Sequence, residues 1–252
     1  MLKELKILKH HGKQYISDLR RQKISPLFRG RPVISESISE EEIRSAAAVC
    51  PVRAGDKSSG SIALGKCVFC KECAFLLPGK IEFTNDYHIA SNDRNSLIIK
   101  PGDHNLIKLD EKKVRQEVRD LFKGALKLRQ VSAGGDNSCE MELAASGNVN
   151  FDMGRYGIEF VASPRHADGV VITGPISENM SRALEITYDA IPEPRIIILA
   201  GTDAISGGIF AGSTALDRSF LEKHHIDLYV PGNPAHPLTF INGIMDLLGI
   251  KK

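Results

Sequence analysis

The chain has 252 residues, of which 42% are hydrophobic and 25% are charged, which are ordinary proportions for a globular protein. Its 33 Lys and Arg residues nearly balance 31 Asp and Glu residues, so the formal net charge is only +2. This balance and the absence of Trp argue against a nucleic-acid partner. No apolar run approaches the roughly 20 residues of a membrane-spanning helix, so we expect no direct transmembrane segment.

The first segment is basic. In residues 1–23 the apolar positions roughly follow helical spacing among many Lys and Arg, which predicts an amphipathic helix. Pro26–Pro32 then predicts an extended linker. Two interpretations of the helix remain open: an arm that packs on a neighbouring subunit, or a segment that adsorbs to an anionic membrane surface. Because the segment lacks the long uncharged core of a secretory signal, we expect a cytoplasmic protein.

The part of the chain that follows differs in composition and in patterning. Residues 33–90 hold four of the five cysteines and lack long periodic segments, which predicts a small domain nucleated by a cofactor. We expect residues 91–110 to form a connector with a turn at Pro101-Gly102. Residues 111–130 are predicted to form an amphipathic helix. Their apolar residues at helical spacing are Val114, Val118, Leu121, Ala125 and Leu128.

From residue 131 onward, short β-branched runs alternate with helical patterns. This alternation predicts a mostly parallel sheet covered by helices. Gly- and Pro-rich segments follow the predicted strands, at the edge where such sheets hold ligands. The predicted strands are Ile158–Ala162, Gly169–Thr173, Arg195–Ala200 and Asp227–Val230, and the predicted helices are Glu178–Ala190 and Pro237–Leu248.

Four cysteines form the most informative motif. Cys67-x2-Cys70-x2-Cys73 is the spacing that places three thiolates around one face of a [4Fe–4S] cube. A remote Cys-Pro pair, here Cys50-Pro51, supplies the fourth ligand in such motifs. We therefore predict one [4Fe–4S] cluster on Cys50, Cys67, Cys70 and Cys73. The alternative is a structural zinc site on the same residues, although zinc sites more often show Cys-x2-Cys pairs.

This motif and the preceding PLFRGRP stretch resemble a two-cluster bacterial ferredoxin, of the type found in complex I and formate hydrogenlyase. In that family the first repeat would place its other ligands at Glu40, Ile43 and Ala46. The fourth cysteine of the second repeat would fall at Leu77. All four missing ligands belong to one cluster, and all four retained cysteines belong to the other. The resemblance therefore implies a small ferredoxin-like α+β domain with a single cluster.

A second set of segments lies in order along residues 129–250. These segments are Ser132–Glu140, Ser163–Asp168, Ile172–Gly174, Ser206–Phe210 and Val230–Pro234. They resemble the small subunit of energy-converting [NiFe]-hydrogenases and the related 20-kDa-type subunit of complex I. The resemblance implies a flavodoxin-like α/β domain that lies beside a large catalytic subunit and normally holds one [4Fe–4S] cluster.

The cluster ligands of that family would fall at Asp136, Cys139, Asp203 and Asn233, so only one cysteine remains. Hard oxygen ligands do not suit an iron–sulfide cube. We therefore expect this second cluster to be lost and Cys139 to be a small buried residue. The alternatives are a different metal held by Asp136, Asp203 and Cys139, or an unusual cluster.

Other polar residues near this pattern have two interpretations. In family terms, Glu140 and the Pro164–Asp168 run lie near the large subunit and a quinone-like cavity or proton path. In structural terms, Arg165 and Asp168 cap a junction between a strand and a loop. His236 is a further candidate ligand.

The two resemblances divide the chain into an arm (1–32), a ferredoxin-like domain (33–110) and a hydrogenase-small-subunit-like domain (111–252). They imply an iron–sulfur electron-transfer subunit of an oxidoreductase complex related to complex I and formate hydrogenlyase. It would not be catalytic alone, and large and membrane subunits would hold it at the inner membrane. The alternative is a non-redox scaffold whose cluster is structural. A free-standing enzyme is disfavoured, because the sequence lacks nucleotide- and phosphate-binding glycine motifs.

Overall fold

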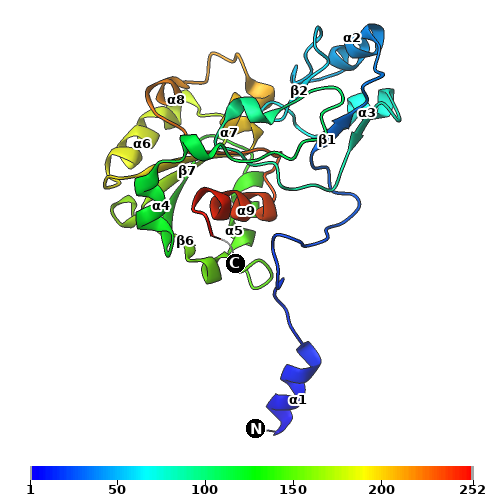
Figure 1. Cartoon of the computed structure of the whole chain (residues 1–252). Coiled ribbons are helices and arrows are strands. Elements are labelled where there is room, and N and C mark those ends of the chain that lie inside the picture. Colours follow the sequence, from blue (N-terminus) through cyan, green and yellow to red (C-terminus); the bar gives the residue numbers. More distant parts are fainter. Residues whose placement is uncertain (1, 251–252) are drawn as a thin grey trace.

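A five-stranded parallel sheet forms the centre of the second half of the chain in the computed structural model, which describes residues 2–250 (Figure 1). The strands are β5 (Leu126–Ser132), β6 (Ile158–Phe160), β7 (Gly169–Thr173), β8 (Ile196–Ala200) and β9 (Leu228–Val230). Their order is β6-β5-β7-β8-β9, and every neighbouring pair is parallel. This is the flavodoxin-like strand order, so the predicted α/β fold of this half is confirmed.

Helices cover both faces of the sheet. One face packs against α4 (Gln116–Phe122), α5 (Ser138–Ser146) and α9 (Pro237–Leu247), and the other packs against α6 (Glu178–Asp189), α7 (Thr202–Ser206) and α8 (Ser219–Lys223). In β8, Ile198 packs in the first core, while Ile197 and Leu199 pack in the second. A strand buried on both faces needs a continuous apolar sequence, which explains the RIIILA run.

The region before the sheet has a core of its own. β1 (Pro32–Ile34) pairs antiparallel with β3 (Ile81–Phe83), and β2 (Ile62–Ala63) pairs antiparallel with β4 (Ile98–Ile99). The helices of this region are α2 (Glu40–Ala48) and α3 (Glu72–Leu76). Its fully buried side chains include Ile34, Leu64, Ile89, Leu97 and Ile99. Short 3-10 helices along the chain are Arg94–Leu97, Glu111–Lys113, Met153–Tyr156, Pro164–His166 and Gly208–Phe210.

The small region is attached directly to the edge of the sheet. Ser91 and Tyr229 of the edge strand β9 exchange backbone hydrogen bonds of 3.0 and 2.8 Å. Gly243 of α9 lies so close to Ala90 that an added Cβ would be 2.6 Å from the Ala90 Cβ. The two parts of the chain therefore share an interface made of backbone pairing and close packing.

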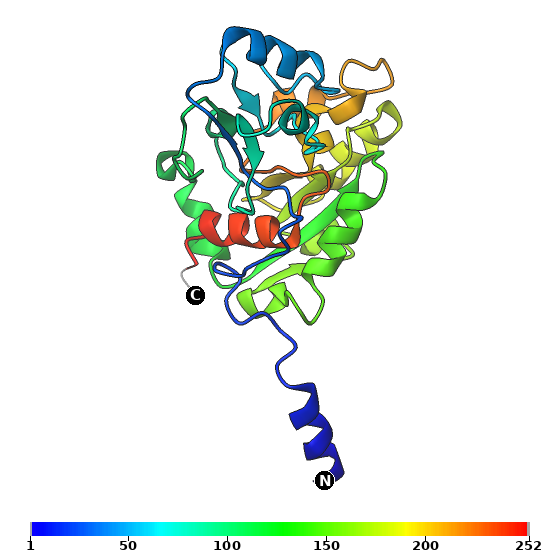
Figure 2. The same ribbon diagram turned by 90° about the vertical axis from the view of Figure 1, so that its right-hand side faces the viewer.

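The N-terminal helix is shorter than predicted. α1 (Leu2–His11) has no buried residue and extends away from the rest of the chain in both views (Figures 1 and 2). It ends at Gly12, which takes a left-handed φ of +62° while its N–H donates to the Leu8 carbonyl (3.1 Å). Beyond it, Leu19 is fully buried in the core of the sheet region. The predicted helix over 1–23 is therefore wrong after His11.

The predicted helix over 111–130 is also wrong beyond Phe122. Leu126 and Leu128 belong to β5, where they are fully buried and alternate with more exposed residues. Leu121, which the helical pattern places with the core residues, is 60% exposed. Apolar residues at spacings of two also satisfy part of a helical pattern, and pairing of β5 with both β6 and β7 decides in favour of the strand.

The other predicted strands and helices of the sheet region agree with the structure to within two residues at their ends. In the same region, the strand β5 and the helices α5, α7 and α8 were not predicted. Among residues 2–250, no helix has the length and apolarity needed to cross a bilayer.

The Leu128→Ala substitution tests the strand assignment. It removes a fully buried side chain from β5, so the free energy of unfolding should fall by about 3 kcal/mol. The matched control Leu121→Ala, on the exposed face of α4, should change it by less than about 0.5 kcal/mol. Urea unfolding followed by circular dichroism measures both. Equal losses would contradict the assignment.

Candidate functional site

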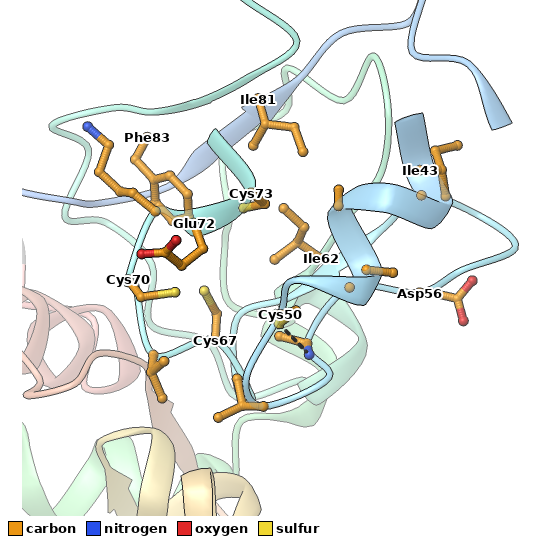
Figure 3. Close-up of a pocket in the computed structure, with 18 of the residues that line it drawn as sticks. Ile43, Cys50, Asp56, Ile62, Cys67, Cys70, Glu72, Cys73, Ile81 and Phe83 are labelled. Atoms are coloured by element: carbon orange, nitrogen blue, oxygen red, sulfur yellow. Dashed lines mark hydrogen bonds between the residues drawn. The ribbon is translucent and has the colours of Figure 1, made fainter. Parts of the chain in front are cut away.

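Four cysteine side chains line one cavity in the small region (Figure 3). Cys50 follows α2, whereas Cys67, Cys70 and Cys73 lie on the loop that leads into α3 and in its first turn. The cavity volume is about 30 Å³, larger than the roughly 10–15 Å³ that one water needs. The remaining wall is mostly apolar and includes Ile43, Ala46, Ile62, Ile81 and Phe83. The structure thus brings together all four residues of the predicted set.

The backbone of the cysteine loop is bent by two unusual residues. Phe69 and Lys71 have left-handed φ values of +54° and +70°, which few non-glycine residues adopt. With this bend, the N–H of Phe69 donates to the Cys67 Sγ (3.3 Å). A second N–H, from Ala54, donates to the Cys50 Sγ (3.2 Å). Amide hydrogen bonds to sulfur are a typical feature of iron–sulfur sites.

Two residues far from the motif hold the same loop from outside. The Thr202 Oγ1 donates to the Cys67 carbonyl (2.7 Å), and the Arg29 Nη1 donates to the carbonyls of Phe69 (2.9 Å) and Cys70 (3.3 Å). Sequence reasoning missed both residues. Thr202 lies 135 positions from Cys67, and Arg29 lies 40 and 41 positions from the two loop residues it contacts, so no spacing rule connects them.

The apolar wall disfavours free thiolates. Burial, with smaller contributions from the neighbouring cysteines, raises the pKa of Cys67 to about 12 and that of Cys73 to about 11. Thiolates collected in such a site need a positive partner, which a bound metal centre supplies. The chemistry of this donor set therefore fits a thiolate-bound metal centre.

Within residues 2–250, no group of three or more His, Cys, Asp or Glu side chains is arranged to hold a metal ion. A structural zinc site would bring four sulfurs to about 2.3 Å from one ion. In a [4Fe–4S] cube each cysteine binds a different iron, so its ligands surround the group without converging on one point. Four cysteines around a cavity fit the second arrangement.

The segment that would carry the other ferredoxin ligands is a regular helix. α2 begins with a capping box, in which the Glu42 N–H donates to Ser39 Oγ (3.3 Å) and the Ser39 N–H donates to Glu42 Oε2 (2.7 Å). Glu40, Ile43 and Ala46 all lie in this helix. Ala46 is buried in the core of the small region, and Leu77 packs against that core. Apolar carbon therefore occupies these two positions.

Three of the four residues in the second predicted set lie near one another at the carboxyl edge of the sheet. Cys139 is 8% exposed, and burial, with smaller contributions from Glu140, Asp203 and Asp136, raises its pKa to about 12. An added Cβ on Gly201, at φ +94°, would be 2.4 Å from the Cys139 Sγ. Asn233 is exposed and lines a separate cleft of about 320 Å³ beside Arg29 and His236.

The carboxylates around Cys139 bind hydroxyl groups. Glu140 Oε1 accepts hydrogen bonds from Ser132 and Thr173, both at 2.6 Å. Asp136 accepts hydrogen bonds from the N–H and Oγ of Ser138. Burial, together with Asp136 and Glu140, raises the pKa of Asp203. Asp136, Glu140 and Asp203 thus form an acidic network at this edge of the sheet, beside the neutral thiol of Cys139.

The remaining candidates have structural partners. Asp168 precedes β7 at the amino edge of the sheet, where its Oδ2 accepts the Lys127 N–H (2.7 Å). Arg165 is exposed. His236 caps α9 by accepting the Leu238 N–H at Nδ1 (3.1 Å), and burial lowers its pKa to about 4. The capping role predicted for Asp168 matches these contacts, and His236 acts as a helix cap.

Comparison with known proteins assigns the second half of the chain. The family described as NADH ubiquinone oxidoreductase, 20 kDa subunit, matches residues 137–247. The "Probable membrane-bound hydrogenase subunit mbhJ" of Pyrococcus furiosus is 30% identical over 115 residues, which are 46% of this chain and 69% of that protein. A subunit of the NADH-quinone oxidoreductase of Desulfovibrio desulfuricans is 39% identical over 109 residues, which are 43% of this chain and 59% of that protein.

The chain therefore belongs to the NADH ubiquinone oxidoreductase 20 kDa subunit family, as the second resemblance predicts. It spans between 59% and 69% of the length of these two relatives. The structure of the membrane-bound sulfane sulfur reductase, an archaeal respiratory membrane complex, contains a chain with 25% identity and a TM-score of 0.46. That match covers 53% of this chain and 74% of the other. The family match begins at residue 137, after all the residues that line the cysteine cavity.

The reactivity of Cys139 tests the acidic network. Because its pKa is raised to about 12, its thiolate fraction at pH 8 should be at least about 100-fold below that of an ordinary cysteine. Iodoacetamide labelling followed by mass spectrometry should therefore modify Cys139 only slowly in the folded protein. The rate should increase about tenfold per pH unit up to about pH 10. Rapid labelling at pH 8, comparable to that of the denatured chain, would contradict this.

Proposed function

We propose that this chain is an electron-transfer subunit of a membrane-associated oxidoreductase complex related to complex I and to energy-converting hydrogenases. It would hold one [4Fe–4S] cluster on Cys50, Cys67, Cys70 and Cys73, and the cluster would supply one-electron transfer. The observation that carries the proposal is the lining of one cavity by these four side chains, in a chain of this family.

The cluster would lie in a ferredoxin-like domain over residues 33–110, fused to a small-subunit-like domain over residues 111–252, with residues 1–32 as an arm. The separate core of the small region supports this division. The element order β1-α2-β2-α3-β3, in which the first and last strands pair, also supports it. Each helix of this order adjoins one part of the cysteine motif.

The second cluster of the family would be absent from this chain. An iron–sulfide cube with thiolate ligands carries net negative charge, and Asp136, Glu140 and Asp203 would add more at the same edge. Of the four family positions only Cys139 is a cysteine, and the oxygen ligands at the other three do not suit an iron–sulfide cube. With this cluster absent, electrons would reach or leave the chain by a path that does not pass through the usual second centre.

The relative from Desulfovibrio desulfuricans is a subunit of NADH-quinone oxidoreductase, and the relative from Pyrococcus furiosus is a subunit of a probable membrane-bound hydrogenase. By analogy, the partners of this chain would be a large subunit of the same type and membrane subunits that hold the complex at the inner membrane. The carboxyl edge of the sheet would face the large subunit.

Iron and sulfide analysis of anaerobically purified protein tests the cluster count. We expect about four irons and four sulfides per chain, because one four-cysteine site is present. About eight irons would show that the second site still holds a cluster. A chain with zinc in place of iron would overturn the proposal.

Matched cysteine variants test the assignment of ligands. Cys67→Ser should remove most of the iron, because its thiolate is one of the four ligands, whereas Cys139→Ala should retain it all. Iron content and the visible absorbance of the cluster give the readout. Loss of iron in Cys139→Ala would place this cysteine among the ligands.

Electron paramagnetic resonance separates electron transfer from a purely structural role. After dithionite reduction we expect one S = 1/2 signal that disappears on reoxidation. A cluster that cannot be reduced, together with unfolding of residues 33–90 when the iron is removed, would support the scaffold alternative.

A further inference from the structure

The carbonyl groups of the cysteine loop are held from two sides by residues outside it. Thr202, in the first turn of α7, binds the Cys67 carbonyl, and Arg29, just before β1, binds the carbonyls of Phe69 and Cys70. Three carbonyls within four consecutive residues are thus bonded to groups outside the loop. This arrangement occurs on the loop that carries three of the four cysteines.

Thr202 is fixed firmly enough to act on the loop. It is fully buried, its N–H donates to the Gly232 carbonyl (2.8 Å), and its own carbonyl accepts from Ser206 Oγ (3.1 Å). Its hydroxyl therefore reaches the Cys67 carbonyl (2.7 Å) from a rigid turn at the end of β8. A buried hydrogen bond of this kind joins the sheet region to the cysteine loop.

The direction of the peptide groups gives this contact a consequence. A peptide whose carbonyl is bound on one side presents its N–H on the other, so the N–H groups of Val68, Cys70 and Lys71 face away from Thr202 and Arg29. The neighbouring Phe69 N–H reaches the Cys67 sulfur. Left-handed residues at 69 and 71 are strained, so the outside bonds help to keep this orientation. N–H groups directed at the sulfurs, and a nearby guanidinium, favour the reduced, more negative form of a cluster.

We propose that Thr202 and Arg29 are positioning residues that raise the reduction potential of the cluster by holding the loop carbonyls away from it. The proposal rests on the function proposed above. The proposed function gives the sheet region only a role in partner binding. The positioning role of Thr202 would make the sheet region also a determinant of the reduction potential of the cluster in the small region.

Potentiometric titration monitored by electron paramagnetic resonance tests this on the full chain. Thr202→Val keeps the shape and removes the hydroxyl, so its midpoint should become more negative. At fixed potential, the ratio of reduced to oxidised cluster should fall by up to about tenfold, which corresponds to about 59 mV for one electron. Thr202→Ser restores the donor and should return the midpoint to the wild-type value. Arg29→Gln should also lower the midpoint, and Arg29→Lys should lower it less because the charge remains.

Two controls carry matched changes elsewhere. Thr187→Val removes a hydroxyl that donates to the Ala183 carbonyl (2.8 Å) in α6, on the far side of the sheet region in Figure 1. Arg21→Gln removes an arginine whose side chain is 89% exposed. Neither should move the midpoint.

The outcomes are distinguishable. If Thr202→Val and Arg29→Gln keep a full cluster and their midpoints match those of the controls, the positioning role is overturned and the proposed function stands. If Thr202→Val binds no iron, the midpoints of Arg29→Gln and Arg29→Lys decide whether the positioning role holds, because Arg29 is exposed. Thr202→Ser then serves as the check on folding. If the wild-type chain itself binds no iron, the proposed function fails and the positioning role fails with it.

Discussion

The placement of four cysteine side chains around one mostly apolar cavity is the constraint on which the small region depends. The region is short, and its two sheets have only two strands each. Burial raises the pKa of Cys67 and Cys73, because a buried charge loses solvation. A bound metal centre would resolve this conflict, since it would neutralise the thiolates and join segments that share little secondary structure. The core around Ile34, Leu64 and Leu97 supports the cavity from behind.

The contacts between the two regions extend this constraint to the sheet. Thr202 lies where β8 ends, next to Asp203 and close to the turn at Gly232. At the end of β8, Thr202 binds the cysteine loop, and its neighbour Asp203 belongs to the acidic network around Cys139. In open parallel sheets the carboxyl edge is the usual place for ligands. In this protein the same edge also contacts the region that holds the cysteines.

Sequence patterns predicted most of the sheet region, because a strand buried on both faces must be continuously apolar and a helix at the surface must be amphipathic. Ile196–Ala200 follows the first rule closely and Glu178–Asp189 follows the second. The pattern failed at residues 111–130, where pairing with two neighbouring strands outweighed helical spacing. It failed again after His11, where burial of Leu19 outweighed the continuing basic character of the segment.

The spacing of Cys67, Cys70 and Cys73, together with the Cys-Pro pair at residue 50, determined the candidate ligand set by itself, because a cube imposes short and regular spacings on three of its ligands. The lack of cysteine at residues 136, 203 and 233 was likewise visible in the sequence alone. Only the tertiary structure decided which distant groups act on these residues. Thr202 and Arg29 reach the cysteine loop, and Glu140 reaches Ser132 and Thr173, through contacts that depend on how the chain folds back on itself. Hydrogen bonds between segments far apart in sequence leave no periodic trace, since only the folded backbone brings their donors and acceptors together.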